Sequence, residues 1–462
     1  MGSLPGRHLP TDRRRRGAPL TDAALTPADL ELFDKSFTAN PAYRAMQNAV
    51  TQTSVDNIAL DRDVVTSIDP TVSNLLDDWR TTNQKQSGRC WMFAGLNLLR
   101  AGAMKKTNIP DFEFSQAYVQ FWDKLERSNY LLEAVIETSD RPLDDRTVAF
   151  VLDSAVGDGG QWNMFVALVR KHGLVPKSAM PESESSSATR KLNSNLRKVL
   201  HEGARDLRAL HGKGVEAQRE RKQELLDVVH RVLRIHLGTP PQTFLWQWKD
   251  KEREFHRRGW VTPQEFAAEY VTLPYEDYVC LVHDPRESSP YGRTFTVDYL
   301  GNVVGGERVT YLNVEIDVLK RIAKDAIVGG EPVWFGCDVD PMMQRSVGVW
   351  DAKLYDYGSV YDTAFTLSKA ERLDYHQSAM THAMLFTGVD VVDGEPRRWR
   401  VENSWGDENA DKGFYTMNDS WFDEYVFEIA APRSVLPKEL ADALDTEPIV
   451  LPAWDPMGSL AR

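Results

Sequence analysis

Cysteine is scarce in this chain. Only Cys90, Cys280 and Cys337 occur among the 462 residues, and no two of them have C-x-x-C spacing. A small, odd number of cysteines fits neither a disulfide framework nor a structural zinc cage, because both need several paired thiols. We therefore expect free thiols and a reducing compartment.

Long apolar runs are also missing. The first 35 residues contain no apolar segment typical of a secretory signal, and no window approaches the roughly 18 consecutive apolar residues of a membrane span. We therefore expect no membrane association and a cytoplasmic location. Four consecutive arginines at residues 13–16 are interpreted as part of a solvated, flexible N-terminal tail.

Positive charge is in deficit over the whole chain, which carries 55 Lys and Arg against 68 Asp and Glu, a formal net charge of -13. Because nucleic-acid binding depends on Lys and Arg, a surface devoted throughout to phosphate contacts is excluded. Any such binding must be local. The candidate segment for such binding is residues 190–234, which contain 12 Lys and Arg but only 6 Asp and Glu.

Two hydrolase signatures are absent. The sequence contains neither the H-E-x-x-H pattern of zinc peptidases nor the G-x-S-x-G turn of serine hydrolases. The corresponding zinc and serine chemistries are therefore not supported. We expect neither a metal nor an organic cofactor.

The composition that remains is typical of a folded enzyme, with 42% hydrophobic and 10% aromatic residues. Thr26-Pro27 combines an N-cap with proline at the first helical position, so ordered structure is predicted to begin there. Polar residues 181–187 are interpreted as a linker or exposed loop. Further helices are predicted near 91–100, 115–134 and 163–172, as a pair within 190–234, and after Thr262-Pro263.

Strand patterns dominate the C-terminal part of the chain. Segments 331–339, 383–392 and 399–402 are short, apolar and bounded by glycine-containing turns. They predict a mainly β half that follows a mainly helical half. A cleft between two such halves is a common location for an active site.

Four residues carry the chemistry of a thiol hydrolase. Cys90 begins an apolar helical segment, where the helix N-terminus and a nearby imidazolium would lower the pKa of its thiol. His382 would take and return the proton, and Asn403 would fix the tautomer of the imidazole. Gln84 would stabilise the oxyanion together with the Cys90 backbone N–H. Trp405 could shield the His382–Asn403 hydrogen bond from water.

Each element alone has an ordinary alternative. A lone cysteine is more often a buried hydrophobe, a lone histidine can be a satisfied core residue, and a lone glutamine is usually on the surface. The order Gln84, Cys90, His382 and Asn403, each within its own local motif, makes coincidence improbable. Cys280 and Cys337 lack this context and are interpreted as structural thiols.

The motifs resemble the papain-like cysteine proteases, and within them the bleomycin hydrolase or bacterial aminopeptidase C group. The matching stretches are residues 83–91, 378–384, 401–406 and 447–458, so the resemblance covers most of the chain. Ser87 stands where secreted relatives have a disulfide cysteine. The separation of Cys90 and His382 is about twice the roughly 130–150 residues typical of papain, and a helical insertion accounts for much of the difference.

The resemblance implies an α+β, two-lobed papain-like fold. It implies a flexible tail at 1–24, a helical lobe at 25–180, a helical insertion at 181–275, a β-rich lobe at 276–435 and a C-terminal arm at 436–462 that enters the cleft. Gly159 and Gly160 resemble the glycine pair on which the substrate backbone lies. Trp405 and the end of the arm, Ala461 and Arg462, complete the implied substrate-binding set.

The resemblance further implies a cysteine aminopeptidase that releases N-terminal residues from short peptides, with bleomycin-type amides as additional substrates. The arm would exclude longer N-terminal extensions and pair its carboxylate with the substrate's ammonium group. With Arg462 in place, that carboxylate lies one residue beyond Ala461. A homohexamer is also implied by the resemblance.

Two alternatives remain at this point. One is a papain-like endopeptidase, in which the arm does not restrict the cleft. The other is a hexameric nucleic-acid-binding protein with secondary peptidase activity, for which the basic residues within 190–234 would supply the binding surface.

Overall fold

The computed structural model describes residues 23–76 and 79–461, which fall into two compact units. The first unit extends to Leu60 and includes Tyr355–Phe365. Its helices are α1 (Pro27–Ala39), α2 (Pro41–Val50), α3 (Val55–Ala59) and α14 (Tyr357–Tyr361). The predicted helix start is confirmed, because the Thr26 side chain accepts the Asp29 N–H and Pro27 is the first helical residue. Residues 1–22 of the predicted tail lie outside the described residues.

The second unit contains a twelve-stranded mixed sheet. Eleven strands follow one another in the order β14 (Ile449–Leu451), β5 (Arg293–Val297), β6 (Tyr311–Asn313), β4 (Tyr278–Val282), β13 (Val426–Pro432), β7 (Val333–Cys337), β10 (His382–Val392), β11 (Glu395–Glu402), β12 (Phe414–Asn418), β9 (Val349–Trp350) and β8 (Met343–Gln344). The twelfth, β1 (Asn74–Leu75), pairs with β10. The strands predicted at 331–339, 383–392 and 399–402 correspond to β7, β10 and β11.

Helices of the second unit lie mainly before β4 in the chain. They are α4 (Arg62–Ser67), α5 (Cys90–Thr107), α6 (Gln116–Glu137), α7 (Arg146–Asp153), α8 (Trp162–His172), α9 (Glu184–Ser187), α10 (Arg190–Ala209), α11 (Val215–Leu237) and α12 (Pro263–Tyr270), with α13 (Ile316–Val328), α15 (Lys369–Asp374), α16 (Asp419–Tyr425) and α17 (Lys438–Ala443) later. A separate hairpin is formed by β2 (Phe244–Lys249) and β3 (Phe255–Val261). Short 3₁₀ helices include η5 (Pro456–Ala461) at the end of the described chain.

The sheet separates two hydrophobic cores, because successive side chains of a strand point to opposite faces. In β10, Ala383 and Leu385 belong to one core, which they share with helices α5, α6 and α8. Met384 and Phe386 belong to the other, which they share with α13 and α16. Helix α5 therefore packs on the face of β10 that carries Ala383 and Leu385, next to His382 at the start of the strand.

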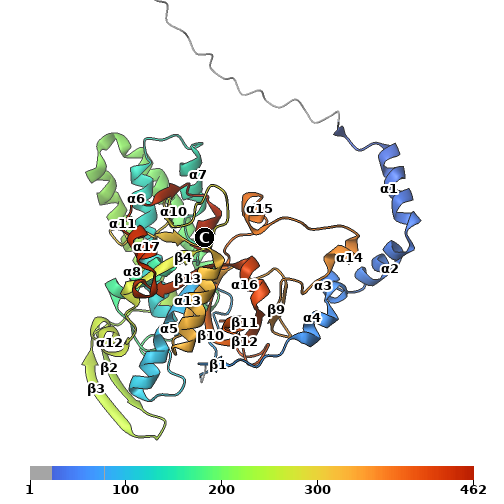
Figure 1. The fold of residues 1–462 in the computed structure, drawn as a ribbon. Coiled ribbons are helices and arrows are strands. Elements are labelled where there is room, and N and C mark those ends of the chain that lie inside the picture. The colour runs from blue at the N-terminus through green and yellow to red at the C-terminus, as the bar shows by residue number, and fades with distance from the viewer. Residues whose placement is uncertain (1–22, 77–78, 462) are drawn as a thin grey trace, which may run out of the picture. The chain divides into compact units, whose positions relative to one another are not determined.

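The predicted helical pair within 190–234 is present as α10 and α11, which pack on each other and on α6 (Figure 1). Leu192, Leu196 and Leu200 recur every four residues along α10 and are completely buried, as an amphipathic helix requires. The expectation of an exposed loop at 181–187 is wrong. This segment contains α9, Ser186 is buried, and Ser183 caps the helix through a capping box.

The α+β fold class is confirmed by these helices and by the mixed sheet. The five-part division of the chain stays a prediction. Within the described ranges, no helix combines the length and the apolar character needed to cross a membrane.

Candidate active site

Cys90 is the first residue of α5, and the turn Ser87-Gly88-Arg89 leads into it. The following apolar residues bury this end of the helix, and Cys90 itself is only 3% exposed. Its sulfur lies within reach of the backbone N–H of Ala383, which acts to lower the pKa of the thiol. The thiol at the helix start and the first residues of β10 are therefore neighbours, although they are far apart in sequence.

His382 and Asn403 are brought together by the pairing of β10 with β11. His382 begins β10, and Asn403 directly follows the last residue of β11. The imidazole Nε2 lies 2.9 Å from Asn403 Oδ1, and the same oxygen accepts the Ser404 backbone N–H at 2.8 Å. Because Oδ1 is an acceptor, Nε2 carries the proton in this arrangement and Nδ1 is the basic nitrogen.

Burial governs the protonation of both reacting groups. It raises the pKa of the Cys90 thiol to about 11, against the opposing backbone N–H groups of Ala383, Trp91 and Cys90. It lowers the pKa of His382 to about 4, and the hydrogen bond with Asn403 opposes this only in part. The helix N-terminus acts on the thiol in the expected direction, since the N–H groups of Cys90 and Trp91 lower its pKa, but burial outweighs them. This enclosed state therefore favours a neutral thiol beside a neutral imidazole.

Gln84 is buried next to the turn that precedes Cys90. Its Oε1 accepts the Ser404 hydroxyl at 2.6 Å, its Nε2 donates to the Ser87 carbonyl at 2.5 Å, and its backbone N–H donates to the Ser404 carbonyl at 2.8 Å. These contacts fix the carboxamide with its NH2 group toward the turn. An amide nitrogen carries two hydrogens, so a second donor remains for a substrate oxygen.

Trp405 lies against the imidazole, with ring centroids 5.1 Å apart and planes inclined at 38°. The guanidinium of Arg345 covers the Trp405 ring at 4.4 Å from its centroid. This position fits the expected shielding of the His382–Asn403 hydrogen bond. A contact of Trp405 with substrate stays a prediction.

The glycine pair has structural partners of its own. A Cβ on Gly160 would lie 2.4 Å from Cε2 of Trp91, so the indole occupies the space that any side chain would need. The Gly159 carbonyl accepts Arg127 Nη2 at 2.6 Å. The close packing of Trp91 thus explains Gly160 without a substrate, and the substrate-binding role of both glycines stays a prediction.

Asp158, which sequence reasoning missed, connects this loop to the thiol turn. Its carboxylate accepts the Gly88 backbone N–H at 3.1 Å, Lys124 Nζ at 2.6 Å, and the side chains of Thr189 and Asn193 at 2.5 and 2.8 Å. Burial acts to raise the pKa of this carboxyl, but Lys124 and the other donors outweigh it and hold the pKa well below its usual range. The available signal was a charged residue between the glycines of a tight turn.

Two ion pairs fix the elements that carry the site, and the first of them is fully buried. Glu402, at the end of β11, accepts Arg100 Nη2 at 2.7 Å and Asn97 Nδ2 at 2.8 Å, both from α5. Arg89, directly before Cys90, pairs with Glu182 at 2.7 Å. Helix α5 is thereby tied to the strand that precedes Asn403 and to the segment before α9.

The C-terminal arm reaches the residues that precede His382. Ser459 Oγ donates to the Met380 carbonyl at 2.8 Å, and the Tyr311 hydroxyl donates to the Met457 carbonyl at 3.2 Å. Ala461 is the last residue of η5, and Arg462 lies outside the described residues. The substrate-binding roles of Ala461 and Arg462 stay predictions.

Metal ligands are not assembled anywhere in residues 23–76 and 79–461, where no three or more His, Cys, Asp or Glu side chains form a group able to hold an ion. The three cysteines are free and buried. Cys280 donates to Asn163 Oδ1 at 3.1 Å, and burial raises the pKa of both Cys280 and Cys337 well above the usual value.

A thiol at the start of a buried helix, with an imidazole oriented by a carboxamide, defines the class of papain-like cysteine peptidases. The sequence comparison agrees, since residues 24–458 match the model of the Peptidase C1-like family. The chain belongs to this family.

Similar proteins cover nearly the whole chain. Aminopeptidase C of Lactobacillus delbrueckii subsp. lactis is 41% identical over 437 residues, which are 94% of this chain and 97% of the relative. Human bleomycin hydrolase is 45% identical over 391 residues, 82% of this chain and 86% of the relative. The crystal structure of PepW from Lactobacillus rhamnosis HN001 has a TM-score of 0.93 and 43% identity, and the match covers 95% of this chain and 99% of that one.

Proposed function

We propose that this chain is a cysteine aminopeptidase that releases N-terminal residues from short peptides through a thioester intermediate. The main support for the proposal is that the Cys90 sulfur lies beside the backbone N–H of Ala383. Ala383 directly follows His382, and the imidazole of His382 is hydrogen-bonded to Asn403. Amides of the bleomycin type are a second substrate class, in line with the bleomycin hydrolases among the similar proteins.

The reaction begins with a neutral pair. Cys90 attacks the scissile carbonyl while Nδ1 of His382 takes the thiol proton, so charge develops only as the carbon–sulfur bond forms. The backbone N–H of Cys90 and the second N–H of Gln84 Nε2 stabilise the oxyanion. The imidazolium then protonates the departing amine, the carbon–nitrogen bond breaks, and a thioester remains.

Water completes the cycle. Neutral His382 removes a proton from a water molecule that attacks the thioester, and the imidazolium returns this proton to the Cys90 sulfur as the amino acid leaves. Asn403 keeps Nε2 protonated throughout, so Nδ1 alone exchanges protons. Trp405 keeps water from competing for the hydrogen bond between His382 and Asn403.

Exopeptidase specificity is assigned to the C-terminal arm. The contact of Ser459 with the Met380 carbonyl supports a position of η5 beside the catalytic strand. There the arm would limit the room for residues before the cleaved bond, and the end of the chain at Ala461 or Arg462 would meet the substrate ammonium. Gly159 and Gly160 would hold the substrate backbone. An endopeptidase is not favoured, because it would need this part of the cleft to be open.

A cytoplasmic homohexamer is the proposed setting. Three free, buried thiols are compatible with a reducing compartment. The β2–β3 hairpin exposes the cross-strand pair Leu245 and Trp260, with 43% and 71% of their surface accessible, and an assembly of copies would cover such residues. Size measurement by light scattering tests the hexamer directly.

The decisive experiment compares a fluorogenic aminoacyl amide with its N-acetylated twin. We expect the wild-type protein to cleave only the free-amine substrate, Cys90→Ala to cleave neither, and a form that lacks residues 459–462 to gain the acetylated substrate. Cys280→Ala serves as the matched thiol control and should keep most turnover, because it removes a buried thiol away from α5.

The same experiment can contradict the thiol mechanism and the exopeptidase specificity separately. Activity that survives Cys90→Ala would remove the thiol from the mechanism. Equal cleavage of both substrates by the wild-type protein would make the chain an endopeptidase.

A further inference from the structure

Among the described residues of the C-terminal arm, one charged side chain is deeply buried, that of Asp455, which is 6% exposed. Its Oδ1 and Oδ2 accept Arg286 Nη2 and Nη1 at 3.0 and 3.1 Å, a two-pronged contact in which both oxygens are engaged. Oδ1 also accepts the Met457 backbone N–H at 2.9 Å. The same carboxylate therefore caps η5 and fastens it to the body of the protein.

Arg286 is held in place independently of the arm. Asp284 accepts Arg286 Nε at 2.9 Å and Nη2 at 2.7 Å. The backbone of Asp284 is in turn bonded to the Asn313 side chain, at 2.8 Å through its N–H and 2.9 Å through its carbonyl. The loop after β4 thus fixes the guanidinium of Arg286, whose Nη1 and Nη2 atoms point to Asp455 of the arm.

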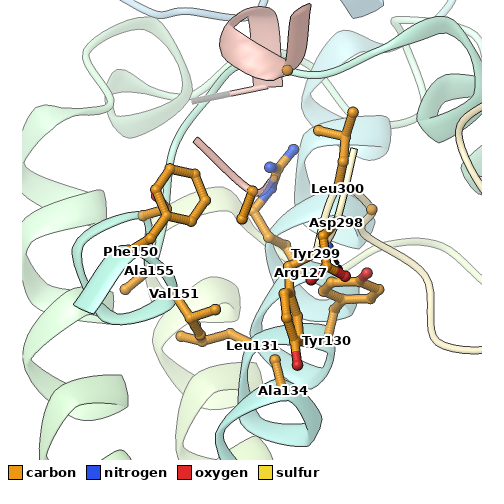
Figure 2. Close-up of a pocket in the computed structure, with 14 residues that line it drawn as sticks. Arg127, Tyr130, Leu131, Ala134, Phe150, Val151, Ala155, Asp298, Tyr299 and Leu300 are labelled. Carbon is orange, nitrogen blue, oxygen red and sulfur yellow. Dashed lines mark hydrogen bonds between the residues drawn. The ribbon is translucent and has the colours of Figure 1, made fainter. Parts of the chain in front are cut away.

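Apolar packing beneath the arm is incomplete. A cavity of about 70 Å³ lies between α6, α7, residues 298–301 and the arm, and the arm presents only Ala453 and Gly458 to it. Figure 2 shows Phe150 and Val151 on one side of this space and Tyr130 and Tyr299 on the other. Ala453 and Gly458 fill little of this space, so the apolar attachment of η5 depends on Met457 and Leu460, which are 2% and 3% exposed. Polar contacts add to this attachment and can fix its position.

The other ion pairs of the described part of the arm are exposed, among them Arg433–Asp445 and Lys438–Asp442. Glu447 pairs with Arg308 at 3.2 Å, with side chains 86% and 57% accessible, so solvent screens the interaction. Trp454 stacks on the Arg146 guanidinium at 3.7 Å from the ring centroid. Within the part of the arm that the structure describes, only the Asp455 contact combines burial, charge and a direct link to the cap of η5.

We propose that Arg286 is a specificity-determining positioning residue, which holds Asp455 so that η5 stays beside the catalytic strand and the enzyme remains an exopeptidase. Arg286 touches no reacting atom and acts through Asp455 and the Ser459–Met380 contact. This inference rests on the aminopeptidase function proposed above. It assigns the fastening of the arm to a residue far from it in sequence.

The test uses Asp455→Asn in the full-length chain. Asparagine keeps the size of the side chain and its acceptor for Met457, but loses the charge that Arg286 binds, while the Arg286–Asp284 pair remains. We expect kcat/KM for the N-acetylated substrate relative to the free-amine substrate to rise at least about tenfold, which corresponds to the loss of about 1.4 kcal/mol of discrimination. The kcat for the free-amine substrate should change less than about threefold.

Two further variants keep the test sharp. Arg286→Lys retains a charge between the two aspartates without the two-pronged geometry, and should shift the ratio in the same direction by a smaller factor. Arg308→Met removes the exposed arm contact and should leave the ratio unchanged. Hydrogen exchange of the amides at 457–461 should accelerate in Asp455→Asn and stay as in wild type in Arg308→Met.

The outcomes separate this inference from the proposed function. An unchanged ratio in folded Asp455→Asn, or a parallel loss of activity toward both substrates, would overturn the role of Arg286. If Asp455→Asn does not fold, the same readings on Arg286→Lys decide the question. If the wild-type protein cleaves both substrates equally, the aminopeptidase proposal fails, and hydrogen exchange at 457–461 still tests whether Asp455 fastens the arm.

Discussion

At the residue scale, burial is the main influence on the ionisable groups near the site. It shifts the pKa of Cys90 upward and that of His382 downward, so both neutral forms gain. It also raises the pKa of Glu428 to about 8, because this carboxyl lies in β13 without a hydrogen-bond partner among the described residues other than the weak thiol donor Cys280. Desolvation alone therefore keeps three polar side chains uncharged near neutral pH.

The protonation of Cys90 can be measured through its reactivity. Only the thiolate is a good nucleophile, so alkylation by iodoacetamide should be slow at pH 7 and accelerate up to a pKa near 11. Mass spectrometry of the peptide that contains Cys90, over a pH series, gives the rate. Cys90→Ala identifies labelling of the other thiols.

A plateau in alkylation rate from neutral pH upward would contradict this expectation. It would mean that Cys90 rests as a thiolate beside a protonated His382. Substitution of His382 by Ala should then slow alkylation at pH 7, whereas a neutral resting pair predicts little change.

Glu428 should make stability fall as pH rises. The pKa of Glu428 is raised by burial from its ordinary value of 4.5 to about 8, so the folded state binds more protons than the unfolded state within this range. The stabilisation that comes from neutral Glu428 is complete below pH 4.5 and is lost as the pH rises to 8. At about 1.4 kcal/mol per pH unit, the free energy of unfolding falls by at most about 4 kcal/mol between pH 5 and 8. Glu428→Gln should remove this loss, as measured by urea denaturation at both pH values.

The comparison must use the difference between wild type and variant. His382 and His283 both have a pKa lowered to about 4 by burial, so they make stability rise between pH 4 and 6.5 in both proteins. A pH dependence of unfolding that is identical in wild type and Glu428→Gln would show that Glu428 is charged or paired in the folded state.

At the scale of elements, the start of α5 depends on how closely the 157–161 loop approaches it. Trp91 occupies the space above Gly160, and its Nε1 donates to the Asp158 carbonyl at 2.7 Å. Trp91, the residue after Cys90, is therefore hydrogen-bonded to the loop that contains Asp158. Any displacement of Trp91 should move the thiol.

Gly160→Ala should be destabilising and should reduce turnover. The new Cβ would lie 2.4 Å from Trp91, and relief of such overpacking costs about 1–3 kcal/mol. Because Trp91 follows Cys90, we expect kcat to fall about tenfold or more, since small displacements at a reacting group are costly. Thermal unfolding and steady-state kinetics give both values.

Gly212→Ala is the matched control. A Cβ there meets nothing within 4 Å, so stability and kcat should remain near wild type. If Gly160→Ala were as stable and active as Gly212→Ala, the loop would have room to move away from Trp91, and the proposed coupling to the thiol would be wrong.

Local sequence signals predicted the elements whose determinants are local. The caps Thr26 and Thr262 were read correctly, and so was the leucine spacing of α10. The segment 181–187 was not, because its helix is short and its burial depends on the Glu182–Arg89 pair, formed with a residue far away in sequence. Two-residue strands such as β8 and β9 likewise exist only through their pairing partners.

The same distinction applies to the site. Gln84, Cys90, His382 and Asn403 stand in short motifs, so the sequence alone predicts them as site residues. Asp158, Glu402 and Arg286 act through partners that only the fold brings close. The pKa of the thiol could not be predicted for the same reason, since it depends on burial by several elements rather than on the helix end alone.

At the scale of the whole molecule, five of the twelve Lys and Arg side chains of residues 190–234 form ion pairs within the fold. Arg219 and Lys222 of α11 both pair with Glu133 of α6, at 3.1 and 2.5 Å. Arg221 pairs with Asp206 and Glu224, and Arg231 with Asp227. The two pairs with Glu133 hold the insertion on α6, whereas the others lie within the insertion. All of them reduce the positive potential that the composition of 190–234 suggests.

Binding to duplex DNA should therefore be weak at physiological salt, with a dissociation constant no tighter than roughly 10⁻⁴ M, the weak end of non-specific binding. The net charge of -13 acts in the same direction. Fluorescence anisotropy with a labelled duplex, measured over a salt series, gives both affinity and slope. Micromolar binding that falls steeply with salt would contradict this expectation and restore the nucleic-acid alternative.

Glu133→Gln tests the physical reason for the weak binding. This change releases Arg219 and Lys222 from their shared carboxylate, so affinity for DNA at low salt should rise above that of wild type. Glu137→Gln removes the same charge from the same helix but has no ion pair to release, and should have a smaller effect. Equal affinities of the two variants would mean that net charge alone, and not the pairing with Glu133, controls the contact with DNA.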